Sequence, residues 1–186
     1  SPGAALMAPL DLEKAVAGDY DRIAAAVEER FGRLDGLVHC AALLGTLTPV
    51  ELYEVPTWCR VMHVNVTAAF ALTQVLLPAL RRSHDASVIF TSSSVGRKGR
   101  AHWGAYATSK FALEGLSQVL ADELSGNSRV RVNTINPGPA RTLMRRQAYP
   151  SENLESVPLP ETLLEPYLQL LGPRGAGTTG QALNSQ

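Results

Sequence analysis

Cysteine is scarce in this sequence, which has only Cys40 and Cys59. Their spacing is unlike that of paired metal ligands, and no neighbouring histidine completes a set around His39. So little cysteine favours a reducing compartment over a secreted, disulfide-stabilised one. We therefore expect a cytoplasmic protein without a structural metal, and Cys40 is interpreted as a small buried hydrophobic residue.

An excess of charge is also missing, because 17 Lys and Arg residues balance 17 Asp and Glu residues. This balance argues against nucleic acid or an anionic membrane surface as a partner. The longest useful apolar run, residues 68–77, contains Thr73 and Gln74 and is too short to span a bilayer. Residues 1–10 lack the basic start and long apolar run of a secretory signal.

Short apolar segments alternate with longer amphipathic ones along the 186 residues, which is about one domain's worth of chain. This alternation predicts an α/β fold, with a parallel sheet covered by helices on both faces. Strands are expected at residues 4–10, 37–41, 87–91, 129–136 and 181–183, and helices at 19–31, 57–82, 104–124 and 160–171.

Three local features qualify these predictions. Asp19 or Asp21 can cap the first helix and Gly32 can end it. Pro78 should kink or end the second helix. Residues 142–159 are polar, contain two prolines, and are expected to form a mobile loop.

The pair Tyr106 and Lys110 carries the clearest chemistry. Four residues apart on a helix, the two side chains share one face. A phenol loses its proton near pH ~10, and a nearby ammonium group lowers that pKa. The pair therefore predicts an acid or base that works near neutral pH. Ser93, thirteen residues before Tyr106 and just after an expected strand, can bind the same substrate oxygen.

Five elements in order give the chain a family resemblance: Asn65 in His63-Val64-Asn65-Val66, Ser93, Tyr106 with Lys110, Asn136-Pro137-Gly138, and Thr142. Together they resemble the classical short-chain dehydrogenase/reductase superfamily from about residue 10 to the end of the chain. In members of that family the sequence around the catalytic serine resembles Ser-Ser-x-x-Gly, in which the second serine is catalytic. Ser92-Ser93-Ser94-Val95-Gly96 fits this pattern only if the catalytic serine is Ser93.

The resemblance implies a doubly wound, Rossmann-like, three-layer domain over residues 1–186 and an NAD(P)(H)-dependent oxidoreductase acting on alcohols or carbonyls. It implies that Tyr106 is the general acid/base, that Lys110 lowers its pKa and binds the nicotinamide ribose, and that Ser93 holds the reacting oxygen. Pro137, Gly138 and Thr142 are implied to meet the nicotinamide carboxamide.

Other positions keep two interpretations. Asn65 is implied to be a catalytic bend that holds a relay water toward Lys110, and this role is compatible with a core amide bonded to the backbone. Asp11 is either an acid near the adenine ring or a helix cap. His39-Cys40-Ala41-Ala42 resembles the family's Asn-Asn-Ala-Gly only at Ala41, which is expected beside the adenosine. Arg97, Lys98 and Arg100 form either a solvated loop or a cradle for an anionic substrate.

A glycine-rich phosphate-binding turn, which such folds place after their first strand, is absent from this sequence. The resemblance begins at the third strand of the sheet, so two βα units are expected to be missing. At ~30 residues each, they predict roughly 50–60 further N-terminal residues in the natural chain. Without them residues 4–10 lose their neighbour and residues 37–41 form a bare edge strand.

Three functional hypotheses follow. The first is an enzyme that binds NAD(P)(H), with NADP the first expectation although the segment that discriminates it from NAD is absent. The second is a protein of the same fold that binds or regulates without catalysis, and the third is a fragment that needs a partner chain. The resemblance also implies a small-molecule alcohol or carbonyl substrate and a homodimer or homotetramer, formed through the helices at 57–82 and 104–124.

Overall fold

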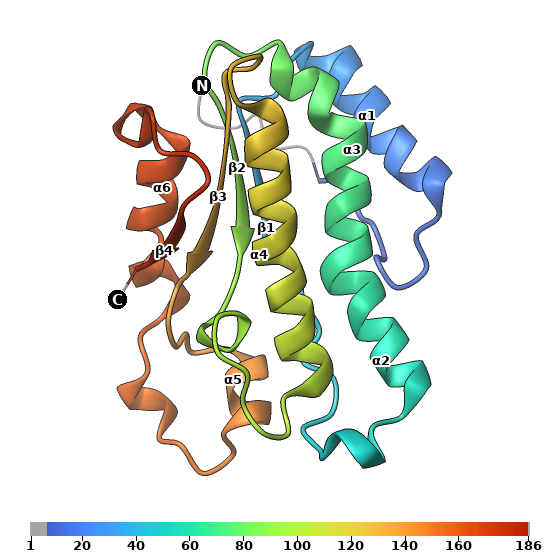
Figure 1. Ribbon diagram of the computed structural model, residues 1–186, viewed down its shortest axis with the longest axis vertical. Coiled ribbons are helices and arrows are strands. Elements are labelled where there is room, and N and C mark those ends of the chain that lie inside the picture. The colour runs from blue at the N-terminus through green and yellow to red at the C-terminus, as the bar shows by residue number, and fades with distance from the viewer. Residues whose placement is uncertain (1–6, 186) are drawn as a thin grey trace.

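Strand β2 (Ala86–Thr91) lies inside a four-stranded sheet in the computed structural model, which describes residues 7–185. Its neighbours are β1 (Gly36–His39) and β3 (Val130–Asn136), and β4 (Ala182–Asn184) extends the sheet beyond β3. The strand order is β1-β2-β3-β4 and all pairings are parallel (Figure 1). The predicted α/β fold class is confirmed.

Helices cover both faces because successive side chains of β2 point to opposite sides. Val88 and Phe90 pack with α3 (Ala68–Arg81) and α4 (Gly104–Leu124). Ile89 points the other way, toward α6 (Glu165–Leu171). Figure 1 shows α6 on one side of the sheet and α3 and α4 on the other. The result is a three-layer, doubly wound arrangement.

Helix α1 (Ala17–Phe31) packs on α3. Its N-cap is Val16, whose backbone N–H donates to the Asp19 carboxylate at 2.8 Å, so Asp19 stabilises the first turn from inside the helix. Gly32 ends the helix as predicted, with a left-handed φ of 67°.

The predicted helix at 57–82 is one continuous run that begins as α2 (Val55–Met62) and ends as α3. A π-helical turn, His63–Thr67, joins the two parts and carries Asn65. The run continues past Pro78 to Arg81 instead of stopping at the proline. Its 27 residues are long and apolar enough to cross a membrane, a test that buried core helices of soluble proteins also pass. Contacts with α1 and α4 place it among the packed helices.

Two further predictions of local structure are wrong. Residues 7–10 form no strand, since no strand lies beside them to pair with, and residues 4–6 lie outside the described part. Residues 142–159, expected as a mobile loop, contain α5 (Leu143–Ala148), which the Thr142 hydroxyl caps by accepting from the Arg145 N–H at 3.1 Å. Single 3₁₀ turns occupy Val50–Leu52, Ser94–Gly96, Leu154–Ser156, Pro160–Leu163 and Pro173–Gly175.

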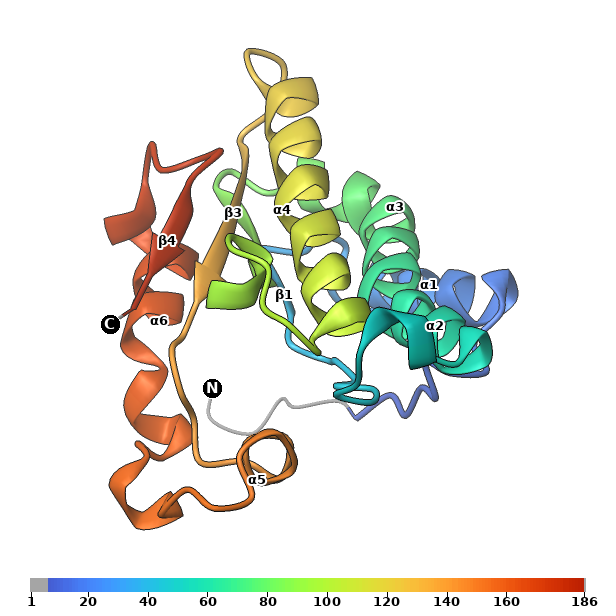
Figure 2. The same ribbon diagram turned by 60° about the horizontal axis from the view of Figure 1, so that its bottom comes forward.

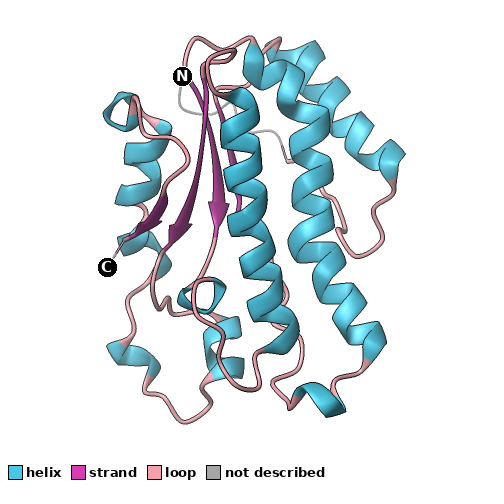
Figure 3. Ribbon diagram, in the orientation of Figure 1, coloured by secondary structure: helices cyan, strands magenta, loops and turns pink. Residues whose placement is uncertain are grey.

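Within residues 7–185, β1 pairs only with β2, so its other edge is bare as predicted. The carboxyl ends of the strands meet at one end of the sheet, where the long loops and α5 gather (Figure 3). Figure 2 brings this end forward and shows α5 set apart from the sheet. In open parallel sheets this is the end at which ligands bind. The assignment of residues 1–186 to one domain stays a prediction.

Candidate active site

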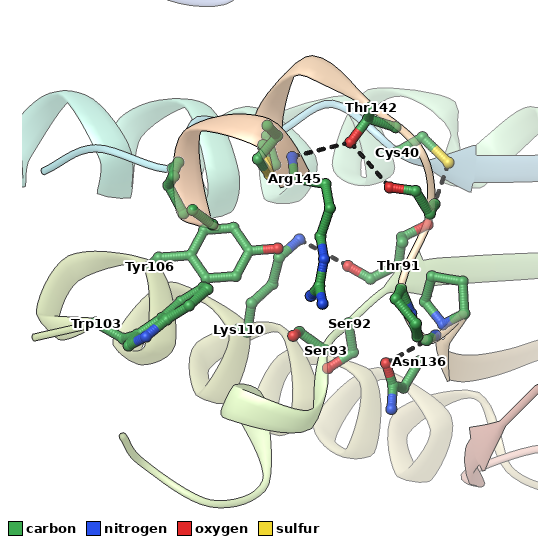
Figure 4. Close-up of a pocket in the computed structure, with 18 of the residues that line it drawn as sticks. Cys40, Thr91, Ser92, Ser93, Trp103, Tyr106, Lys110, Asn136, Thr142 and Arg145 are labelled. Atoms are coloured by element: carbon green, nitrogen blue, oxygen red, sulfur yellow. Dashed lines mark hydrogen bonds between the residues drawn. The ribbon is translucent and has the colours of Figure 1, made fainter. Parts of the chain in front are cut away.

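A cavity of about 350 Å³ opens at the carboxyl ends of the strands. Each of β1, β2 and β3 contributes the residues that follow it, α4 supplies one wall and α5 another (Figure 4). The predicted site residues that line it are Ser93, Tyr106, Lys110, Pro137, Gly138 and Thr142. Residues far apart in the sequence thus meet in one place because the parallel topology brings their strand ends together.

Tyr106 stands in the first turn of α4 with its ring against Trp103, the two centroids 5.8 Å apart. Burial raises the pKa of Tyr106 from 10.0 to about 12, and a hydrogen bond with the Ser93 side chain acts in the opposite direction. The phenol is therefore protonated at neutral pH, and Ser93 is close enough to share a bound oxygen with it.

Lys110 is 2% exposed, and its Nζ donates to the Thr91 carbonyl oxygen at 2.8 Å. The ammonium lies 5.4 Å from the centroid of the Tyr106 ring. Burial lowers the pKa of Lys110 from 10.5 to about 8. The predicted lowering of the Tyr106 pKa is wrong for this structure, because desolvation of the phenolate by burial is the largest effect and raises that pKa.

Asn65 makes three hydrogen bonds from a side chain that is 1% exposed. Its Oδ1 accepts from the Leu43 N–H at 2.7 Å, and its Nδ2 donates to the Leu43 carbonyl at 2.9 Å and to Ser109 Oγ at 2.9 Å. The amide therefore ties the segment after β1 to α4, as the core interpretation requires. It does not line the cavity, and its relay role stays a prediction.

The turn after β3 needs its glycine. Gly138 has a φ of 78°, a left-handed conformation that side chains disfavour, and its N–H donates to Asn136 Oδ1 at 3.2 Å. Pro137 and Gly138 face the cavity, and Thr142 lines it while capping α5.

Two predicted cofactor residues do not reach the cavity. Asp11 is exposed, its carboxylate accepts from the Glu13 N–H at 3.1 Å, and it pairs with Lys14 at 3.3 Å. Ala41 is exposed outside the lining, although Cys40 and Ala42 on either side belong to it. Cys40 is exposed rather than buried, with its Sγ 3.2 Å from Thr91 Oγ1, because β1 ends before it.

The basic loop after Ser93 is solvated only in part, since Lys98 and Arg100 are exposed while Arg97 is bonded to neighbouring elements. Arg97 donates to Glu114 at 3.2 Å and to the Leu183 carbonyl at 2.7 Å, so it joins α4 to β4. Arg100 donates to the Tyr149 hydroxyl at 2.5 Å, beside the cavity. Lys98 is exposed.

Sequence reasoning missed three groups of the cavity. Ser92 Oγ is buried and has no hydrogen-bond partner among the described residues. Arg145 belongs to α5 and Tyr149 follows it directly, and the sequence had predicted a loop for both residues. The run Leu143-Met144-Arg145-Arg146-Gln147-Ala148 after Thr142 is rich in helix formers and could have predicted α5. No group of three potential metal ligands comes together within residues 7–185.

The short chain dehydrogenase family profile matches residues 2–153. The uncharacterized oxidoreductase YciK of Escherichia coli K12 is 46% identical over 177 residues, which cover 95% of this chain and 69% of YciK. A solved structure from Pseudomonas syringae is 58% identical with a TM-score of 0.96, covering 97% of this chain and 73% of the other.

A third relative is a structure from Escherichia coli CFT073 complexed with NADPH. It is 47% identical, with a TM-score of 0.92 over 95% of this chain and 73% of that one. The family profile spans most of the chain, and the relatives share both its sequence and its fold. This chain belongs to the short-chain dehydrogenase family of oxidoreductases.

Proposed function

We propose that this protein is an NADP(H)-dependent oxidoreductase that interconverts a small carbonyl compound and its alcohol, with Tyr106 as general acid/base. One observation carries the proposal. Ser93, Tyr106 and Lys110 converge on one cavity at the carboxyl ends of the strands, beside the Asn136–Thr142 segment. The relative that is complexed with NADPH supports the choice of NADP(H).

The cavity fits a nicotinamide cofactor. Hydroxyl, ammonium and backbone groups of Ser93, Lys110 and Thr142 line the cavity beside the Pro137–Gly138 turn, and such polar groups in a largely apolar pocket suit the nicotinamide end of the cofactor. Lys110, Pro137, Gly138 and Thr142 are the residues proposed to hold the nicotinamide end. Asp11 and Ala41 lie outside the lining, so the structure offers no support for the adenosine contacts predicted there.

The chain's own residues supply the proton chemistry. NADPH, when bound, supplies the hydride that adds to the carbonyl carbon. Tyr106, protonated at neutral pH, gives its proton to the carbonyl oxygen while the Ser93 hydroxyl hydrogen-bonds the same oxygen. The product is an alcohol, and Tyr106 is left as a phenolate.

Lys110 is suited to return a proton to the Tyr106 phenolate. Its pKa of about 8 lies well below the value of about 12 for Tyr106, so proton transfer from the ammonium to the phenolate is downhill. The proposed relay water near Asn65 would then return a proton to Lys110. In the oxidation direction the same steps run in reverse, with Tyr106 accepting the alcohol proton.

The test is NADPH consumption by the full-length protein with a panel of small ketones and aldehydes. We expect Tyr106→Phe and Ser93→Ala to lower kcat by about 100-fold or more, the range in which general acid/base catalysis contributes. NADPH binding without turnover of any carbonyl would instead support the non-catalytic alternative.

A homodimer or homotetramer is also proposed. Phe70 on α3 and Phe111 and Val119 on α4 are 47%, 45% and 56% exposed, and large apolar side chains exposed on adjacent helices favour association. Sedimentation of the full-length protein checks this proposal, and a monomer at micromolar concentration would contradict it. Cytoplasmic localisation is proposed from the cysteine content and the balanced charge alone.

A further inference from the structure

Arg145 brings a second cation into the cavity. Figure 4 shows its side chain extending from α5 into the space between Tyr106 and Asn136. Among the residues that line the cavity in the described part of the chain, Lys110 and Arg145 are charged and neither Asp nor Glu occurs. Lys110 donates to the Thr91 carbonyl and is proposed above to hold the nicotinamide end of the cofactor, so Arg145 is the second cation that could meet an anionic substrate.

The guanidinium of Arg145 is held in a fixed orientation. It lies 3.8 Å from the centroid of the Tyr149 ring, a stacked cation–π contact. The Tyr149 hydroxyl in turn accepts from Arg100 at 2.5 Å. A guanidinium placed in this way loses little freedom when it binds a planar anion.

The Glu152 carboxylate already accepts two hydrogen bonds from this guanidinium, in the geometry that the carboxylate of a ligand would adopt. Arg145 Nε donates to one carboxylate oxygen at 2.6 Å and Nη2 to the other at 2.5 Å. The two side chains are 24% and 27% exposed, so the pair is only partly buried. Both side chains keep contact with solvent, so an anion that offers the same two oxygens can exchange with Glu152 at this guanidinium.

We propose that Arg145 recognises the carboxylate of an oxo-acid substrate, and that Glu152 competes with the substrate for it. The proposal rests on the carbonyl reduction proposed above and names the substrate class. The bidentate geometry favours a carboxylate, because it reproduces the contact with Glu152. The other anionic source is a phosphate of NADP(H), and the experiment separates the two.

The kinetic test compares pyruvate, acetoacetate and levulinate with their methyl esters in the full-length protein. Arg145→Gln should raise KM for the preferred acid about 10- to 100-fold, the worth of hydrogen bonds to a charged group, and leave KM for its ester unchanged. Arg146→Gln, the same change at the exposed neighbour, is the matched control and should leave both unchanged.

Glu152→Gln should change KM for the acid in the opposite direction from Arg145→Gln. It removes the competitor and keeps the shape, so KM for the acid should fall while KM for the ester stays the same. A purely structural role of the Arg145–Glu152 pair would make both variants worse for acids and esters alike, and this result would overturn the proposal. A rise in KM for NADPH in Arg145→Gln with an unchanged acid-to-ester ratio would also overturn it and assign the cation to the cofactor phosphate.

A binding measurement keeps the inference separate from the reaction. Trp103 lines the cavity, and the Trp58→Phe change removes the other tryptophan of the sequence given. In the presence of NADP⁺, levulinate should change its fluorescence, and Arg145→Gln should weaken that response about 10-fold or more. Absence of the response with all three acids in the unsubstituted protein would overturn the inference. Failure to reduce acids and esters alike would count only against the proposed reaction.

Discussion

His39, the last residue of β1, should make the fold sensitive to acid. Its Nε2 lies 2.9 Å from Thr73 Oγ1, and the Thr73 hydroxyl donates its own proton to the Ala69 carbonyl at 2.8 Å. The imidazole therefore donates from Nε2, and its ring stacks on Phe90 with the centroids 4.9 Å apart. Burial lowers the pKa of His39 from 6.5 to about 4.

The direction and size of the effect follow from these two pKa values. Since the folded value is the lower one, the unfolded chain takes up a proton first as the pH falls below 6.5. The contribution of the neutral His39 to the free energy of unfolding is fully present above pH 6.5 and declines as the pH falls toward 4. One pH unit is worth about 1.4 kcal/mol, so the loss by pH 4 is about 3 kcal/mol. This is a large share of the roughly 5–15 kcal/mol that stabilises a typical protein.

Urea unfolding at neutral pH and close to pH 4 measures this loss. His39→Gln keeps a donor for Thr73 but cannot be protonated, so it should lose about 3 kcal/mol less than the unsubstituted protein over the same interval. His84→Gln, the same change at an exposed position, is the matched control. Equal acid losses in His39→Gln and the unsubstituted protein would refute the reasoning.

Three further predictions concern the residues around the cavity. Burial holds the pKa of Lys110 at about 8, below its ordinary 10.5, so the unfolded chain binds the extra proton between these values and the fold should gain about 2 kcal/mol from pH 8 to 10. Urea unfolding of Lys110→Met should lack this gain, and an equal gain in the variant would exclude Lys110 as its source. Asn65→Ala should cost about 2–5 kcal/mol in the same assay, because it leaves the Leu43 N–H and carbonyl without partners, and a cost below about 1 kcal/mol would contradict the role of the amide. Gly96→Ala would place a methyl group 2.7 Å from Lys110 Cβ and 2.9 Å from Ser92 Oγ, so we expect a loss of about 1–3 kcal/mol in thermal unfolding, whereas Gly99→Ala, with open space around it, should be neutral. Similar melting temperatures for the two alanine variants would show that Gly96 is not needed for close packing.

Much of the fold was predictable because its signals are local. The apolar run that forms β2 and the glycine after α1 specify their elements without help from the rest of the chain. Residues 7–10 fail for the opposite reason, since a strand needs a partner and its own apolar side chains cannot supply one. The prolines at 150 and 158 favour a loop over residues 142–159, but the short helix α5 ends before both of them.

The grouping of Ser93, Tyr106 and Lys110 was predictable from the sequence, while their electrostatics were not. The order and spacing of Ser93, Tyr106 and Lys110 in the sequence predict that they act together, and all three line one cavity. The pKa of Tyr106 depends on how deeply the ring is buried, and burial is a property of the folded structure that the spacing of two residues does not contain. Arg145 reaches the cavity because of where α5 lies in the folded structure (Figure 4), and no sequence motif predicts that position.

Transfer of deuterium tests the central claim most directly. The full-length protein would be given NADPH deuterated at both positions of the nicotinamide C4 together with its best carbonyl substrate, and the product would be examined by mass spectrometry. The account predicts an alcohol that carries deuterium on the former carbonyl carbon, formed much more slowly by Tyr106→Phe. An alcohol without deuterium, or equal rates for the two proteins, would contradict it.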